Sequence, residues 1–126
     1  MKRKTCTIIG LGYIGLPTAL ILSDNGFNVN GFDINQRIID GLKDGRLHIK
    51  EKGLNELFVK VKSKNSFIPS SELKPSDTYI IAVPTPVLKK NKIVSPDIRF
   101  LENAVLTISK IIKKDDLVII ESTVPV

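Results

Sequence analysis

The sequence contains very little sulfur or imidazole chemistry. It has one cysteine, Cys6, one histidine, His48, and no tryptophan. A single cysteine cannot close a disulfide within the chain or build a cysteine-based zinc site. Cys6 lies in the first apolar run, where we expect a buried small hydrophobic residue rather than a reactive thiol. His48 has only Glu51 nearby as a second ligand, so we expect no metal site and interpret His48 as structural, not catalytic.

A long hydrophobic run is also absent. The longest apolar stretches, such as YIIAV and LVII, are far shorter than the ~20 residues that a membrane-spanning helix needs. The N-terminal segment MKRKTCTIIG is basic and then apolar, as in a signal peptide. Glycines break its apolar part almost at once, however, and no small-residue cleavage site follows. We therefore expect a cytoplasmic protein without a membrane segment.

Aromatic residues are few, at 6% of the chain, whereas the net charge is +6. A basic chain can bind nucleic acid or an acidic ligand, or it can simply be soluble. Its lysines fall in separate groups without interleaved aromatic residues, which is unsuited to stacking bases. Solvated faces explain the charge better, and we expect no nucleic-acid partner. Strong salt-dependent binding to DNA or RNA would mark that weaker alternative.

Apolar runs and amphipathic stretches alternate along the whole chain. Asn35 is placed to cap the second helix, and Ser95 or Asp97 to cap the last one. We expect residues 85–96 to form a loop. Alternating strands and helices predict a mainly parallel sheet with helices on both faces, the doubly wound Rossmann-type α/β class. The predicted strands are 5–10, 27–33, 66–70, 78–84 and 116–123, and the predicted helices are 13–25, 35–45, 54–64 and 97–114.

The chain reads as one domain. Its length of 126 residues is sufficient for a real core, and neither a linker nor a second domain is visible. It stops immediately after a predicted strand, with no helix to complete the unit. We therefore expect residues 1–126 to be the N-terminal part of a longer protein.

The segment GLGYIG carries glycines at Gly10, Gly12 and Gly15, between a strand and a helix. In a dinucleotide-binding loop, the first glycine allows a sharp turn, the second lets a pyrophosphate approach the backbone, and the third lets the helix pack closely. Asp33 ends the next predicted strand, where its carboxylate can accept hydrogen bonds from the adenosine ribose. The same charge repels a 2′-phosphate, so the pattern predicts NAD rather than NADP. Arg37 lies one turn away and could soften this preference.

Several motifs resemble one family over essentially the whole chain. In chain order they are GLGYIGLPTA, GFDIN, GRLHIKEKGL, IAVPTP, SPDIRFLENA and IIESTVPV. Together they are similar to the nucleotide-sugar 6-dehydrogenases of the UDP-glucose/GDP-mannose dehydrogenase family. The HIKE and VPTP pieces resemble the branch that acts on UDP-N-acetyl-D-mannosamine. The resemblance implies NAD-dependent oxidation of a UDP-sugar C6 alcohol to the uronate, for polysaccharide biosynthesis, by a homo-oligomeric full-length enzyme.

The resemblance also implies roles for individual residues. The backbone amides of Tyr13 and Ile14 would contact the dinucleotide, and Asp33 would bind the ribose. Thr85 would lie by the cofactor, and Thr123 would reach the nicotinamide and the catalytic water. Both threonines follow predicted strand ends, where ligands bind in open α/β sheets. Each could instead be a turn or cap residue.

The covalent chemistry implied by the resemblance is not carried by this chain. The family uses a cysteine that forms a thiohemiacetal and then a thioester, with a lysine and an asparagine nearby. Those residues belong to the central and C-terminal parts of the family, and Cys6 in the first strand does not match them. Glu121, near the end of the last predicted strand, faces either the crevice at the strand ends or solvent. We therefore expect the chain alone to bind NAD without oxidising a sugar.

Other functions share part of the pattern. A stand-alone regulatory module that gates a transporter would have the same glycines and strand-end acid at nearly this length. It would not need the threonines of AVPTP and ESTVPV. A 3-hydroxyacid dehydrogenase shares the first half of the chain but does not resemble these two later segments.

Overall fold

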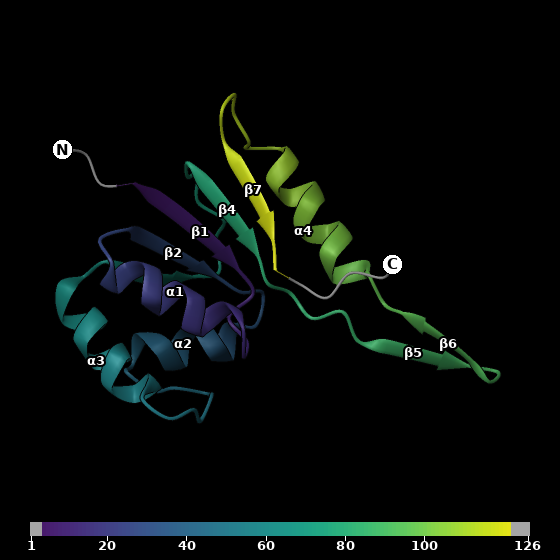
Figure 1. The fold of residues 1–126 in the computed structure, drawn as a ribbon, viewed down its shortest axis with the longest axis horizontal. Helices are drawn as coiled ribbons and strands as arrows, with labels where there is room; N and C mark the ends of the chain where they lie inside the picture. The colour runs from purple at the N-terminus through teal and green to yellow at the C-terminus, as the bar shows by residue number, and fades with distance from the viewer. Residues whose placement is uncertain (1–3, 122–126) are drawn as a thin grey trace.

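Strands and helices alternate in the computed structural model, which describes residues 4–121 (Figure 1). Five parallel strands form the main sheet in the order β3-β2-β1-β4-β7. They are β1 (Thr5–Ile9), β2 (Asn28–Phe32), β3 (Phe67–Ser70), β4 (Thr78–Ile81) and β7 (Leu117–Ile120). The helices are α1 (Gly15–Asp24), α2 (Gln36–Lys43), α3 (Leu54–Lys64) and α4 (Arg99–Ser109). This architecture confirms the predicted Rossmann-type α/β class.

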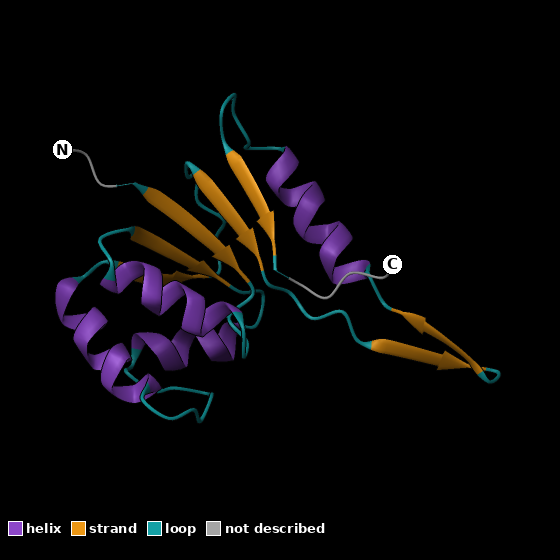
Figure 2. Ribbon diagram, in the orientation of Figure 1, coloured by secondary structure: helices purple, strands orange, loops and turns teal. Residues whose placement is uncertain are grey.

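Helices cover both faces of the sheet, and each face has its own core (Figure 2). On one face, α1, α2 and α3 enclose buried side chains that include Ile8, Leu20 and Phe58. On the other face, α4 packs around Ile9, Tyr79 and Ile81. Successive strand residues point to opposite faces, so Ile8 and Ile9 serve different cores. Burial on both faces explains why β1 and β4, in the middle of the sheet, are mostly apolar rather than alternating. The strand β2 alternates instead, and β7 is exposed.

Local signals in the sequence set the ends of the first two helices. Pro17 lies in the first turn of α1, where its missing N–H has no intrahelical partner. Gly26 follows the helix with φ of +98°, and the Phe27 N–H donates to the Leu22 carbonyl at 3.2 Å, which closes the helix end. The Asn35 side chain accepts a hydrogen bond from the Arg37 N–H at 3.0 Å, so the predicted cap of α2 is confirmed.

The carboxyl ends of four strands lie side by side. Ile9 of β1 is in register with Phe32 on one side and with Ile81 on the other, and Ile81 is in register with Ile120. The next residue of each strand therefore emerges at the same edge of the sheet. Consecutive connections run to opposite sides of β1, which makes this edge the topological switch point where such sheets bind ligands.

The predicted loop at residues 85–96 is wrong, because it contains a β-hairpin. Strands β5 (Val87–Lys90) and β6 (Ile93–Pro96) pair antiparallel and project away from the main sheet (Figure 1). Asn91 and Lys92 join them with φ of 51° and 66°, as a two-residue type I′ turn requires. Glycine usually takes the second position of this turn, so a lysine there concealed the signal.

The predicted helix 97–114 is too long, since α4 ends at Ser109. The N–H groups of Ile111 and Ile112 both donate to the Ile108 carbonyl at 2.9 Å, which tightens the end of the helix. The Asp116 carboxylate then accepts from the Lys113 N–H at 2.8 Å and draws the chain into a turn. The last turn of α4 consequently holds no basic residue.

The start of α4 is held by Asp97 rather than by Ser95, which lies in β6. The Asp97 side chain is buried and accepts from the Arg99 N–H at 3.1 Å and from the Arg99 guanidinium at 2.9 and 2.7 Å. Its own N–H donates to the Pro86 carbonyl at 2.6 Å. Asp97 therefore ties the base of the hairpin to the helix. These bonds from Arg99 lower the pKa of Asp97 from 3.8 to about 2.

The low pKa of Asp97 gives its contribution to stability a defined pH dependence. Because the carboxylate is favoured in the folded state, its contribution is present above pH 3.8 and is lost as the pH falls towards 2. We expect Asp97→Asn to be less stable than the parent chain at pH 6, with the difference shrinking between pH 4 and pH 2. Urea unfolding at several pH values measures this difference. A difference that stays constant down to pH 2 would contradict the assignment.

Candidate functional site

A cavity of about 470 Å³ opens at the aligned strand ends. This volume lies within the ~300–1,000 Å³ typical of small-molecule pockets. Segments from β1, β2, β4 and α4 contribute to its wall, so chain regions distant in sequence meet there. The lining residues are Ile9, Gly10, Gly12, Phe32–Asn35, Ile38, Ala82–Pro84, Phe100, Asn103, Ala104 and Thr107.

The three glycines of the loop after β1 meet different demands. Gly10 has φ of +98°, and a Cβ there would lie 2.8 Å from the Ala82 carbonyl oxygen. A Cβ on Gly15 would lie 1.7 Å from the Gly10 carbonyl oxygen, which no packing can accommodate. A Cβ on Gly12 would meet nothing within 4 Å. The protein itself therefore needs Gly10 and Gly15, whereas only a ligand would make use of the space beside Gly12.

The backbone after Gly12 presents unpaired donors. Among residues 4–121, no acceptor is found for the N–H groups of Gly12, Tyr13 and Ile14. Tyr13 and Ile14 are exposed residues, so the loop that carries these amides lies at the surface. They precede the N-terminus of α1, where the helix dipole adds positive potential. Such an arrangement suits an anionic group.

Asp33 follows β2 and lies against the same loop. Its Oδ2 accepts from the Leu11 N–H at 2.9 Å, and its Oδ1 accepts from the Asn35 N–H at 2.8 Å. A carboxylate offers about four acceptor positions, so further donors can still bind. The sequence analysis assigned only a ligand to Asp33 and did not predict that its carboxylate also binds backbone N–H groups of the protein. The carboxylate also fixes the loop that it faces.

His48 reaches the same loop from the segment between α2 and α3. Its Nε2 lies 2.6 Å from the Leu11 carbonyl oxygen. A carbonyl can only accept, so Nε2 carries the proton and donates. The adjacent Ile49 is buried at 3% exposure and anchors the segment in the core. The sequence-based interpretation of His48 was a structural role, and this hydrogen bond is a specific contact of that kind.

Sequence reasoning missed much of the cavity wall. Phe100, Asn103 and Thr107 come from one side of α4, and Ile34 and Ile38 come from the start of the β2–α2 region. The three α4 residues are spaced three and four apart, which places them on one helix face. An exposed phenylalanine in the first turn of that helix was the signal that could have revealed this wall.

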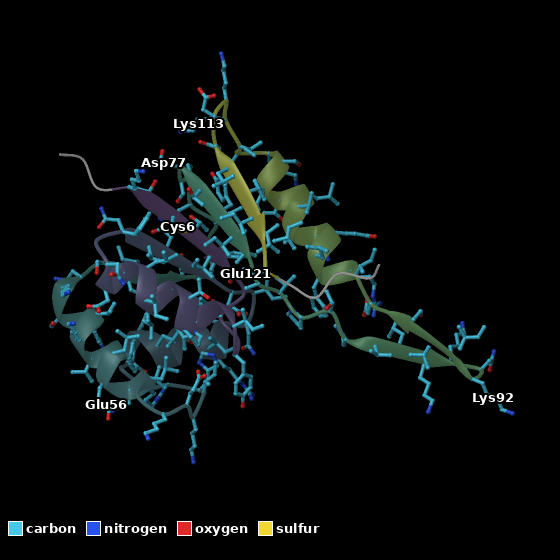
Figure 3. The ribbon with its side chains drawn as sticks, in the orientation of Figure 1. Cys6, Glu56, Asp77, Lys92, Lys113 and Glu121 are labelled. Atoms are coloured by element: carbon cyan, nitrogen blue, oxygen red, sulfur yellow. The ribbon has the colours of Figure 1, made fainter. Side chains whose placement is uncertain are left out.

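The remaining predicted site residues differ in their positions. Thr85 is half-buried and directly follows the lining residue Pro84, without itself lining the cavity. Thr123 lies outside the described residues. Glu121 stands at the carboxyl end of β7, near the start of α1 (Figure 3). Its Oε2 accepts from the Thr18 hydroxyl at 3.3 Å. The functional roles of Thr85, Thr123 and Glu121 therefore remain predictions.

Cys6 is a buried residue of the central strand, as expected. It is 1% exposed, and burial, with a smaller contribution from the charge of Glu121, raises the pKa of its thiol to about 11. Almost no thiolate forms near neutral pH, so Cys6 cannot act as a nucleophile.

The part of the chain that the structure describes contains neither a metal cluster nor a membrane span. No group of His, Cys, Asp or Glu side chains within residues 4–121 is arranged to hold a metal ion. No helix in the same range combines the length and the apolar character that crossing a bilayer requires. A second hollow of about 790 Å³ is formed by the loop after α2 and the start of α3, with no strand contributing to it.

Comparison with known proteins gives a family match over nearly the whole chain. A sequence model of the UDP-glucose/GDP-mannose dehydrogenase family, NAD binding domain, matches residues 4–126. The match includes the glycine loop, Asp33, the VPTP segment and the C-terminal segment around Thr123.

Two curated relatives are similar along the full chain. A UDP-N-acetyl-D-mannosamine dehydrogenase from Campylobacter jejuni is 44% identical over 125 residues, which is 98% of this chain and 30% of the relative. An NDP-N-acetyl-D-galactosaminuronic acid dehydrogenase from Ralstonia nicotianae is 42% identical, with 98% of this chain and 28% of the relative covered. The chain thus spans less than a third of the length of these relatives.

A solved structure has the same fold. The UDP-N-acetyl-mannosamine dehydrogenase from Staphylococcus aureus aligns with a TM-score of 0.90 at 41% identity. The alignment covers 95% of this chain and 29% of that one.

Proposed function

Because the chain belongs to the UDP-glucose/GDP-mannose dehydrogenase family, we propose that it is the NAD-binding domain of a nucleotide-sugar 6-dehydrogenase. The proposed substrate of the longer protein is a UDP-N-acetyl-hexosamine, with UDP-N-acetyl-D-mannosamine as the first candidate. Relatives named for N-acetyl-mannosamine and for N-acetyl-galactosaminuronic acid support an acetamido sugar. Residues 1–126 then form the N-terminal domain of a cytoplasmic, homo-oligomeric enzyme.

The observation that carries the proposal is the open space beside Gly12. In a loop where glycine is otherwise forced by packing, Gly12 has no neighbour within 4 Å of a would-be Cβ. The N–H groups of Gly12, Tyr13 and Ile14, which have no acceptor among residues 4–121, follow one another in the same loop. A pyrophosphate fits both features, because it needs close backbone approach and several N–H donors.

Asp33 supports the adenosine half of the site. Its carboxylate borders the cavity and keeps acceptor capacity after bonding to Leu11 and Asn35. In the proposed complex it accepts from the ribose hydroxyls, and Ile34 and Phe100 cover the adenine. Its negative charge disfavours the 2′-phosphate of NADP.

The chemistry is divided between cofactor and protein. Bound NAD supplies a hydride acceptor. Oxidation of an alcohol carbon to a carboxylate removes two hydrides and adds one oxygen from water, so two NAD are used for each sugar. The residues of this chain bind and orient. We propose that Thr85 and Thr123 lie beside the cofactor, with Thr123 in the nicotinamide and water region.

The chain alone is proposed to bind NAD without oxidising the sugar. Its only thiol, Cys6, is buried in the central strand with its pKa raised to about 11. The nucleophile and lysine used by the family would come from the remainder of a longer protein. A regulatory module would share the glycine loop and the acid, but the dehydrogenase family match favours the enzyme.

A calorimetric titration of the chain with NAD⁺ and with NADP⁺ tests the proposal. We expect NAD⁺ to bind and NADP⁺ to bind at least about tenfold more weakly, ~1.4 kcal/mol. Asp33→Ala should erase this difference. Because Asp33 also holds the Leu11 N–H, the Asp33→Ala variant should lose some affinity for both nucleotides.

The Asp33→Asn variant separates the effect of the negative charge from the effect of the hydrogen bonds that the side chain accepts. It keeps one oxygen acceptor but removes the negative charge, so selectivity should fall more than NAD⁺ affinity does. Failure of the parent chain to bind either nucleotide would refute NAD binding by this chain. Equal binding of NAD⁺ and NADP⁺ by the parent chain would refute only the proposed role of Asp33 in selecting NAD⁺, and not the binding of NAD⁺ itself.

A further inference from the structure

The backbone of Leu11 is held from both sides by side chains. Its N–H donates to Asp33 Oδ2 at 2.9 Å, and its carbonyl accepts from His48 Nε2 at 2.6 Å. The Leu11 side chain is fully buried in the core between sheet and helices. Leu11 stands between Gly10 and Gly12, and both of its backbone polar groups therefore have a fixed partner.

Planar peptide geometry transmits the His48 contact to Gly12. The Leu11 carbonyl and the Gly12 N–H belong to one trans peptide, in which C=O and N–H point in opposite directions. The imidazole binds the carbonyl on one side. The Gly12 N–H must therefore point away from the imidazole. Gly12 is also one of the residues that line the cavity.

Without this contact, no other hydrogen bond among residues 4–121 holds the Leu11–Gly12 peptide itself, although in the next peptide the Leu16 N–H donates to the Gly12 carbonyl at 3.1 Å. Glycine populates a wide range of φ and ψ, and Gly12 has no Cβ contact within 4 Å that would limit rotation. Asp33 fixes the preceding peptide, between Gly10 and Leu11, but not this one. His48 is the side chain among the described residues that bonds to the Leu11–Gly12 peptide.

The position of His48 is itself well defined. Ile49 is 3% exposed in the core, and Leu47 packs against the same cluster, so both neighbours anchor the backbone. The imidazole is thus delivered to the loop from a fixed segment, although the ring itself stays accessible. The contact links the connection between α2 and α3 to the glycine loop.

We propose that His48 is a positioning residue for nucleotide binding, which holds the Leu11–Gly12 peptide so that the Gly12 N–H faces the pyrophosphate. The proposal rests on the proposed NAD binding. It concerns the phosphates alone, because the adenosine half depends on Asp33 and the cavity wall. A merely structural role for His48 would weaken all ligands together.

Three probes distinguish these roles in the intact chain: NAD⁺, ADP and adenosine. We expect His48→Ala to weaken NAD⁺ and ADP by about tenfold, the loss of roughly one hydrogen bond to a charged group. Adenosine, which has no phosphate, should keep its affinity within about twofold by the same reasoning. His48→Gln, whose amide can donate to the same carbonyl, should recover part of the loss. Asn55→Ala, an exposed neutral change in the nearby first turn of α3, serves as the control.

A second measurement does not depend on ligand. One-bond N–H residual dipolar couplings of Leu11 and Gly12 report the orientation of each N–H. In His48→Ala the coupling of Gly12 should change while that of Leu11, held by Asp33, stays the same. Unchanged couplings at both residues, or equal loss for adenosine and ADP, would overturn the proposal. Absence of NAD⁺ binding by the parent chain would instead remove the proposed function on which it rests.

Discussion

Gly12→Ala is expected to fold like the parent chain and to lose most of its affinity for NAD⁺. A Cβ at this position meets no protein atom within 4 Å, so folding should be unaffected. The same methyl group would occupy the space where the pyrophosphate must approach the N–H groups of the loop. Loss of one or two charge-assisted hydrogen bonds corresponds to at least about thirtyfold weaker binding, ~2 kcal/mol. Calorimetric titration measures the affinity, and thermal unfolding confirms the fold.

The control for this variant is another glycine-to-alanine change that is remote from the cavity. Gly41 lies inside α2, and a Cβ there would have its nearest contact at 3.7 Å, an ordinary distance. Gly41→Ala should bind NAD⁺ as the parent chain does. Wild-type affinity in Gly12→Ala would mean that no phosphate lies against the loop.

Gly15→Ala is expected to damage the fold itself. Its Cβ would stand 1.7 Å from the Gly10 carbonyl oxygen and 3.2 Å from the Ala82 Cβ, so helix α1 would have to move away from the loop. Backbone atoms cannot rotate out of the way as a side chain can. We expect a loss of more than about 3 kcal/mol in the free energy of unfolding. That is a large part of the ~5–15 kcal/mol that stabilises a typical domain.

Gly41→Ala again provides the matched comparison, and we expect it to raise the free energy of unfolding rather than lower it. Alanine in an unstrained helix interior is more favourable than glycine by about 0.5–1 kcal/mol, because the unfolded chain loses less freedom. Thermal or urea unfolding of both variants against the parent chain gives the two differences. Equal stability of Gly15→Ala and the parent would show that α1 does not pack against Gly10 as described.

The sequence was sufficient to predict features determined by short-range chemistry. The glycine spacing, the acid after β2 and the Asn35 cap all depend on residues close together in the chain, and the mainly parallel, doubly wound class followed from alternation and right-handed crossovers. The hairpin was missed because Asn91 and Lys92 adopt a conformation for which lysine is an unusual residue. The end of α4 was missed because Asp116 competes for the backbone, which periodicity cannot reveal.

The candidate site was predicted in outline but not in its connections. The glycines and Asp33 were predicted to bind a ligand, yet the bond from Leu11 to Asp33 joins positions 22 residues apart. The bond from His48 to Leu11 spans 37 residues. Contacts of this kind arise only when the tertiary structure brings segments together. Both contacts fix the backbone of Leu11, and residue types alone could not reveal them.

Because Cys6 is buried, the rate at which its thiol is modified measures how often the sheet around it opens. Its thiol lies in β1, which is paired on both sides, and the strand is covered by helices. A reagent such as iodoacetamide reacts only with an accessible thiolate, so modification has to wait until the centre of the sheet opens. The modification rate of the only thiol of the chain therefore reports local opening of the central strand β1, without any engineered label.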